Sequence, residues 1–291
     1  MAANTPRITR AGDIAIGADH PLTIIAGPCV LESLDLGLTV GRALQETCKR
    51  LGLSYIFKAS FDKANRSSVD SPRGPGIDQG LVWLSQISRE LGVPVTSDIH
   101  EPAHAEPAAA VLDILQIPAF LCRQSDLLEA AGRAIAGDPT KAVNVKKGQF
   151  LSPAEMAGPV RKLAEVGASN VMLTERGTFF GYHRLVNDFT GLGDLMELDC
   201  SAFSGGPAPS VCFDVTHSTQ LPGSGAQTGG RPDRAPLLAR AATAAGVAAL
   251  FIEARPAPSK ALSDGATQLP VDTAIEVIEQ CARVRDALHV Q

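Results

Sequence analysis

The sequence has 291 residues, of which 45% are hydrophobic and 20% are charged, and its net charge at pH 7 is -5. This acidic balance, without a dense block of Lys and Arg, argues against a surface for nucleic acid or an anionic membrane, so any anion site must be local. No apolar run is long enough to span a bilayer and residues 1–13 lack a signal-peptide core, which predicts a cytoplasmic protein. The six scattered cysteines form no CxxC pair and are predicted to be reduced thiols.

Short runs of apolar and β-branched residues alternate with segments of helical period. The predicted strands are the eight runs LTIIAGP, SYIFKAS, PVTSDIH, DILQIPAF, AVNVKKG, NVMLTERG, SVCFDVTHS and ALFIEARP. The predicted helices cover residues 33–51, 78–92, 103–112, 125–137, 153–167, 190–200, 234–246 and 272–289. Ser33 and Asp78 stand where a side chain would cap the first two helices.

Apolar strands that alternate with helices favour a parallel sheet covered by helices, and eight repeats close most naturally into a (β/α)8 TIM barrel. An open, doubly wound sheet is the alternative. No linker divides the chain, so residues 1–291 are predicted to form a single domain. Residues 1–21 form an N-terminal extension, suited to a short hairpin that closes the amino-terminal end of the barrel. Residues 219–235 are predicted to be a mobile loop.

Polar residues stand at the end of every predicted strand, where the active sites of such barrels are built. In chain order these residues are Cys29, Lys58, Asp98, His100, Gln116, Arg123, Lys146, Lys147, Glu175, Arg176, Asp214, His217, Glu253 and Arg255. Five of the eight lysines lie at these ends or in the following loops, namely Lys58, Lys63, Lys146, Lys147 and Lys260. In a net acidic protein, this placement predicts a site for phosphate or carboxylate ligands, with scattered surface charge as the alternative. Phe120, Phe179 and Phe180 are interpreted from the sequence as packing residues.

A second set of residues, Cys29, His217, Glu253 and Asp264, follows the first, seventh and eighth strands, which are neighbours in a closed barrel. Thiolate, imidazole and carboxylate ligands suit a divalent ion such as Zn²⁺ or Fe²⁺ better than Ca²⁺ or Mg²⁺. Each residue also has a structural interpretation: Cys29 in the core, His217 in a hydrogen bond, Glu253 beside Arg255, and Asp264 in a turn. No local zinc motif is present, so the spacing leaves both interpretations open.

Eight motifs in order resemble the 3-deoxy-D-manno-octulosonate 8-phosphate synthase family. They are IAGPCVLES, FKASFDKANRSS, TSDIHEP, QIPAFLCRQ, NVKKGQF, LTERGTFFGY, FDVTHSTQLPG and ALSDGATQLP, and the match runs from about residue 22 to residue 270. The resemblance implies a barrel enzyme of lipopolysaccharide biosynthesis, active as a homotetramer. Such an enzyme condenses phosphoenolpyruvate with D-arabinose 5-phosphate and water, and it releases phosphate.

The resemblance also implies roles for individual residues. Phosphoenolpyruvate would be held by Lys58, Lys63, Lys146 and Arg176. The sugar and its phosphate would be held by Asn65, Arg66 and Ser67. Gln116 completes the substrate-binding set, while Phe120 and Arg123 would reach into a neighbouring subunit's site. The expected catalytic residues are Lys146, His217 and Asp98.

The family has metal-dependent and metal-independent branches, and the latter carries Asn at the position of Cys29. The resemblance therefore implies one divalent metal per subunit (Zn²⁺, Fe²⁺ or Mn²⁺), bound by Cys29, His217, Glu253 and Asp264. Arg255 stands where relatives commonly have His, so no role is carried over to it.

Three alternative functions remain open. The nearest is 3-deoxy-D-arabino-heptulosonate 7-phosphate synthase, which uses erythrose 4-phosphate and typically has KPRTS where this chain has KANRSS. The second is a Schiff-base aldolase with Lys58 or Lys146 as nucleophile. The third is a barrel that binds metal or sugar phosphate without catalysis.

Overall fold

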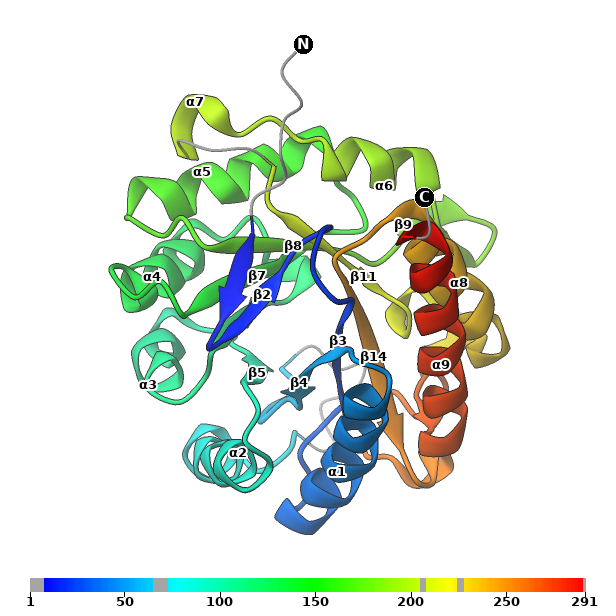
Figure 1. The fold of residues 1–291 in the computed structure, drawn as a ribbon. Helices are drawn as coiled ribbons and strands as arrows, with labels where there is room; N and C mark the ends of the chain where they lie inside the picture. Colours follow the sequence, from blue (N-terminus) through cyan, green and yellow to red (C-terminus); the bar gives the residue numbers. More distant parts are fainter. Residues whose placement is uncertain (1–7, 65–72, 205–207, 224–227, 290–291) are drawn as a thin grey trace.

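The computed structural model describes residues 8–64, 73–204, 208–223 and 228–289. Eight parallel strands pair in chain order, and the pairing of β11 with β14 and of β14 with β3 closes them into a barrel (Figure 1). These strands are β3 (Thr23–Gly27), β4 (Ser54–Lys58), β5 (Val95–Asp98), β6 (Ile114–Ile117), β7 (Ala142–Lys146), β8 (Val171–Glu175), β11 (Ser210–Asp214) and β14 (Ala249–Arg255). The predicted TIM barrel is thus confirmed, and the open sheet is wrong.

Helices surround the barrel (Figure 1). They are α1 (Leu34–Arg50), α2 (Ile77–Leu91), α3 (Ala105–Ala109), α4 (Ser125–Ile135), α5 (Ala157–Glu165), α6 (Phe189–Met196), α7 (Ser201–Ser204), α8 (Ala235–Ala245) and α9 (Val271–His289). The Ser33 side chain caps α1 by accepting a hydrogen bond from the Leu36 amide, as predicted. Asp78 is no cap, because α2 begins one residue earlier, after Gly76. Within the described ranges, no helix is long and apolar enough to cross a membrane.

The N-terminal extension forms the predicted hairpin, with β1 (Thr9–Ala11) antiparallel to β2 (Ile14–Ile16). It binds the beginnings of two barrel strands, because Thr9 Oγ1 donates to the Val171 carbonyl (2.9 Å) and Ser210 Oγ donates to the Ile16 carbonyl (2.7 Å). Ile16 packs in an apolar cluster inside the barrel that includes Phe251. The hairpin therefore closes the end of the barrel that lies opposite the carboxyl ends of the strands.

We expect Ile16→Ala to lower the free energy of unfolding by about 2–5 kcal/mol, because truncation of a fully buried side chain leaves a cavity. Urea unfolding measures the change. Val82→Ala on the exposed face of α2 is the control and should change it by less than about 0.5 kcal/mol. Equal effects of the two substitutions would show that the hairpin does not contribute to the core.

The structure also contains short strands that the sequence did not predict. They are the antiparallel pairs β9 (Thr178–Gly181) with β10 (Arg184–Val186) and β12 (Gln220–Leu221) with β13 (Gly229–Gly230), and β15 (Leu269–Pro270), which pairs in parallel with the end of β14. Phe180 is 97% exposed on the β9–β10 hairpin, so its interpretation as a packing residue is wrong. The described part of the predicted loop at 219–235 contains β12, β13 and the short turn η5 (Pro232–Arg234), while residues 224–227 lie outside the description.

Candidate active site

A polar cavity of about 350 Å³ opens at the carboxyl ends of the barrel strands. Of the predicted site residues, it is lined by Lys58, Lys63, Asp98, Phe120, Lys146, Arg176, His217, Glu253 and Asp264. Cys29 is buried beside Asp264, and Gln116 is buried beside Asp98. Arg123 is exposed and does not line the cavity, and Asn65, Arg66 and Ser67 lie outside the described residues.

Lys58 and Glu253 form a buried ion pair at the base of this cavity, with Lys58 Nζ 2.5 Å from Glu253 Oε1. The register places them together, because β3 lies between β4 and β14 and ends at Gly27. Only glycine fits there, since a Cβ atom on Gly27 would lie 2.1 Å from the Lys58 carbonyl oxygen. Burial alone would raise the pKa of Glu253, but the charges of Lys58 and His217 outweigh burial and lower it to about 2. Glu253 is therefore a carboxylate at neutral pH.

Asp214 joins two of the predicted catalytic residues. Its Oδ2 atom lies 2.7 Å from Lys146 Nζ and 2.8 Å from His217 Nδ1. Burial would raise the pKa of Asp214, but His217 and Lys146 outweigh it, so the net pKa is lowered. This contact orients the imidazole, whose Nε2 atom lies 3.6 Å from Glu253 Oε2. The Lys146 ammonium also lies over the Phe251 ring, 3.6 Å from its centroid.

Asp98 is held by neutral donors on both oxygens. Ser60 Oγ donates to Oδ2 (2.5 Å) and Gln116 Nε2 donates to Oδ1 (2.6 Å). Asn144 in turn donates to Gln116 Oε1 (3.0 Å), and Thr174 donates to Asn144 Oδ1 (2.7 Å). These hydrogen bonds join side chains on four neighbouring strands, from β5 to β8, and hold the Asp98 carboxylate in place. Gln116 therefore positions Asp98 in this structure, rather than facing the cavity itself.

Two further cationic side chains, Arg176 and Lys63, line the cavity without belonging to the ion pairs described above. Arg176 is buried, and its Nη2 atom donates to Gln220 Oε1 (2.6 Å). Its Nη1 atom has no hydrogen-bond partner among the described residues. Burial lowers the pKa of this guanidinium. Burial also acts to lower the pKa of Lys63, but electrostatic interactions with Cys29, Glu253 and Asp264 outweigh burial and raise it. These donors suit an anionic ligand in the cavity.

Three of the four predicted metal ligands converge, and the fourth, His217, lies beside one of them. Cys29, Glu253 and Asp264 each place one ligand atom within 4.8 Å of the others, and the Cys29 thiol donates to Asp264 Oδ2 (3.3 Å). Glu253 Oε2 is buried without a hydrogen-bond partner in the described part of the chain, and His217 Nε2 lies beside it. Burial and the Glu253 charge raise the pKa of the Cys29 thiol. A cation at this point would favour the thiolate and satisfy the unpaired oxygen, so the donor set fits a divalent metal.

The structure adds residues that sequence reasoning missed. Arg255 pairs with Glu32 (2.5 Å), not with Glu253, and Glu32 also accepts from the Leu262 amide (3.1 Å). Gln268 Oε1 accepts from the Cys29 amide (3.1 Å), while its Nε2 atom donates to the Ser263 carbonyl (2.9 Å). These contacts tie the loop that carries Cys29 to the loop that carries Asp264. In the sequence, only the charge of Arg255 pointed to these contacts. The partners that join the two loops, Arg255 with Glu32 and Cys29 with Gln268, lie more than 200 residues apart.

Aromatic rings form the rim of the cavity. Phe120 is 47% exposed, and its ring centroid lies 6.5 Å from that of Phe150 and 6.4 Å from that of Phe179. The rim therefore presents an apolar surface.

Comparisons with known proteins find similar sequences over nearly the whole chain. Residues 4–289 match a family model described as the DAHP synthetase I family. The chain is 48% identical over 276 residues to a protein named 2-dehydro-3-deoxyphosphooctonate aldolase from Syntrophotalea carbinolica, covering 94% of this chain and 95% of the relative. A protein of the same name from Desulfotalea psychrophila is 47% identical over 278 residues, covering 95% and 94%. One from a Synechococcus species is 46% identical over 290 residues, covering 99% and 97%.

Proposed function

Because this chain belongs to the DAHP synthetase I family, we propose that it condenses phosphoenolpyruvate with D-arabinose 5-phosphate and water. The products are 3-deoxy-D-manno-octulosonate 8-phosphate and phosphate. The observation that carries this proposal is the agreement, over nearly the whole length, with relatives that share the name 2-dehydro-3-deoxyphosphooctonate aldolase. That name favours the five-carbon sugar over the erythrose 4-phosphate of the rival reaction.

The cations of the cavity hold the substrates in this proposal. Lys58, Lys63, Lys146 and Arg176 bind the phosphate and carboxylate of phosphoenolpyruvate, which accounts for the unpaired Nη1 atom of Arg176. Asn65, Arg66 and Ser67, which lie outside the described residues, bind the sugar. The positive charges of these lysine and arginine side chains offset the negative charges of the two bound substrates.

The reaction forms a bond between C3 of phosphoenolpyruvate and the aldehyde carbon. Water adds at C2, and the resulting hemiketal phosphate loses phosphate by C–O cleavage. The aldehyde oxygen gains one proton and the water loses two, because its oxygen becomes the C2 carbonyl oxygen and the second proton leaves with the phosphate. Lys146 and His217 share the Asp214 carboxylate and are placed to carry these protons, while Asp98 is held ionised beside them.

We propose that Cys29, His217, Glu253 and Asp264 hold one divalent metal, Zn²⁺, Fe²⁺ or Mn²⁺. When bound, such an ion supplies Lewis-acid chemistry for a carbonyl group or for water. The donor types and the unpaired Glu253 oxygen support this assignment. We further propose a homotetramer in which Phe120 and Arg123 reach a neighbouring subunit's site, supported by the exposure of both side chains.

The function is tested by measuring phosphate release from phosphoenolpyruvate with D-arabinose 5-phosphate or with erythrose 4-phosphate. We expect turnover with the five-carbon sugar and a much lower kcat/KM with the four-carbon sugar. The reverse preference would assign the chain to the rival reaction. Binding of both substrates without phosphate release would mean a non-catalytic barrel, and trapping of a substrate on Lys58 or Lys146 by borohydride would indicate a Schiff-base aldolase.

Arg255→Met is expected to weaken metal binding by about ten- to a hundredfold, because the Arg255–Glu32 pair holds the two loops that carry Cys29 and Asp264. Metal content after dialysis against a graded chelator measures this. Arg133→Met removes an exposed arginine paired with Glu129 on α4 and should leave metal affinity unchanged. Equal metal retention by the two variants would show that the pair is not needed to position the ligands.

A further inference from the structure

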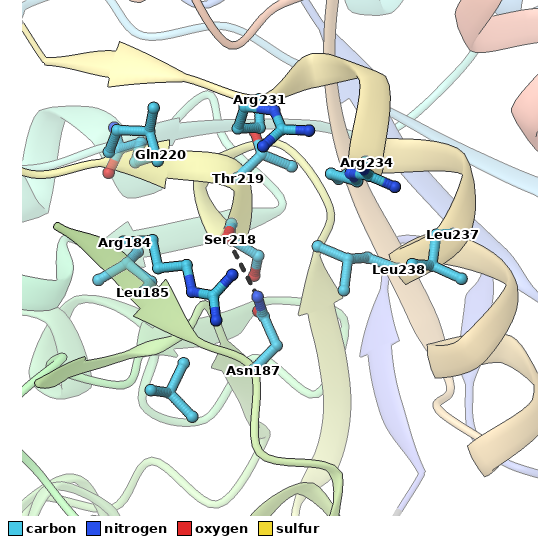
Figure 2. Close-up of a pocket in the computed structure, with 12 residues that line it drawn as sticks. Arg184, Leu185, Asn187, Ser218, Thr219, Gln220, Arg231, Arg234, Leu237 and Leu238 are labelled. Atoms are coloured by element: carbon cyan, nitrogen blue, oxygen red, sulfur yellow. Dashed lines mark hydrogen bonds between the residues drawn. The ribbon is translucent and has the colours of Figure 1, made fainter. Parts of the chain in front are cut away.

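A second cavity, of about 470 Å³, lies beside the candidate active site. It is formed by β10, by the turn η4 (His217–Thr219) that follows β11, by β12, and by the beginning of α8 (Figure 2). Its polar lining includes Arg184, Arg231, Arg234, Asn187 and Ser218. The proposed reaction uses none of these side chains.

Positive charge exceeds negative charge around this cavity. Arg231 forms a bidentate ion pair with Asp233 (2.9 and 2.8 Å), and Arg234 Nε lies 3.3 Å from the same carboxylate. Arg184 forms no ion pair within the described part of the chain. No carboxylate occurs among the described residues that line the cavity. Guanidinium groups in this setting bind phosphate or carboxylate oxygens.

Polar atoms on the cavity wall also lack partners. Ser218 is only 3% exposed, and its Oγ atom has no hydrogen-bond partner among the described residues; the same holds for Asn187 Oδ1. The side-chain Nδ2 atom of Asn187 donates to the backbone carbonyl of Ser218 (3.2 Å). Asn187 and Ser218 therefore lie together, and the Arg184 guanidinium points toward them (Figure 2). Buried polar groups are nearly always hydrogen-bonded. A ligand with hydroxyl groups would offer both a donor to Asn187 and an acceptor to Ser218.

The second cavity adjoins the first through one side chain. Gln220 lines both cavities, and its Oε1 atom accepts the hydrogen bond from Arg176 Nη2 (2.6 Å). Ser218 directly follows His217 in the same short turn. A molecule in the second cavity therefore contacts the segment that positions Arg176 and His217.

We infer that this cavity binds a small hydroxylated phosphate ester, and that its occupancy alters the active site through Gln220. Arg184 contacts the phosphate, Asn187 and Ser218 contact hydroxyl groups, and Leu237 and Leu238 at the start of α8 cover the carbon skeleton. The volume suits a ligand of sugar-phosphate size.

The binding test is isothermal titration of the full chain with D-glucose 6-phosphate as the probe. We expect saturable binding that Arg184→Ala weakens by about tenfold or more, whereas Arg133→Ala leaves it unchanged. Arg184 is exposed, so this variant is expected to fold, and its thermal unfolding is checked. Absence of binding to the unsubstituted protein, or loss of binding in Lys146→Ala but not in Arg184→Ala, would overturn the inference. Equal affinity for inorganic phosphate would overturn the role given to Asn187 and Ser218.

The coupling is tested by the initial rate of phosphate release at low substrate concentration. We expect the probe to change the rate of the unsubstituted protein by about fivefold or more and to leave the Arg184→Ala rate unchanged. A competitor in the active site would inhibit both proteins equally, and this outcome would overturn the coupling. The titration needs no turnover, so a failure of the proposed reaction remains distinguishable from a failure of this site.

Discussion

Treatment of the protein with a chelator is expected to reduce phosphate release from phosphoenolpyruvate and D-arabinose 5-phosphate by at least about a hundredfold, and restored divalent metal is expected to return it. The physical reason is the convergence of the Cys29 thiol with the Glu253 and Asp264 carboxylates, together with the His217 imidazole 3.6 Å from a Glu253 oxygen that has no hydrogen-bond partner among the described residues. Without a bound metal, the Glu253 carboxylate is paired with the Lys58 ammonium at 2.5 Å, and burial raises the pKa of the Cys29 thiol. The rate and the metal content by mass spectrometry are measured on the same samples.

Cys29→Ala supplies the matched variant for this experiment. It should lose bound metal, whereas Cys281→Ala, which removes an equally buried thiol from α9, should retain it. Turnover that chelation leaves unchanged would contradict the metal assignment. So would equal metal content in the two variants, because the Cys29 thiol would then not be a ligand.

Lys146→Ala is expected to lower kcat/KM by about a hundredfold to a thousandfold, since it removes a cation aimed into the cavity. The substitution also removes the Lys146 partner of the buried Asp214 carboxylate, which alters the hydrogen bond between Asp214 and His217 that orients the imidazole. Steady-state phosphate release measures the loss, and thermal unfolding reports the fraction of folded protein.

Lys147→Ala is the contrasting control, because the next lysine in the chain is also buried but does not line the cavity. Its Nζ atom donates to the Gly148 and Leu151 carbonyls (3.4 and 3.1 Å) and lies 3.4 Å from Glu175. We expect this variant to unfold at a lower temperature and to keep kcat/KM within about tenfold in its folded fraction. If Lys146→Ala keeps its activity while folded, the role proposed for Lys146 is wrong.

Lys146 and Lys147 illustrate what the sequence can predict about the site and what it cannot. Both stand at the end of the fifth predicted strand, and the sequence assigned both to one cationic cluster. Successive side chains of a strand point in opposite directions, so only one of them can face the cavity. The choice depends on the pleat of β7 and on the packing around Lys147, which the sequence does not reveal. The aromatic residue Phe180 was misjudged for a related reason, because the short β9–β10 hairpin has too few residues for a periodic signal.

The pattern of residues along the chain was enough to predict the barrel and the end of it that carries the chemistry. Alternating apolar strands and helices favour one closed parallel sheet, and the carboxyl ends of parallel strands meet at one rim. Tertiary structure alone decided which charged residues pair across that rim. Lys58 with Glu253 and Arg255 with Glu32 are partners from opposite ends of the chain, brought together when β14 pairs with β3 to close the barrel. The second cavity likewise exists only in three dimensions, because its walls come from segments that follow two different barrel strands, β8 and β11.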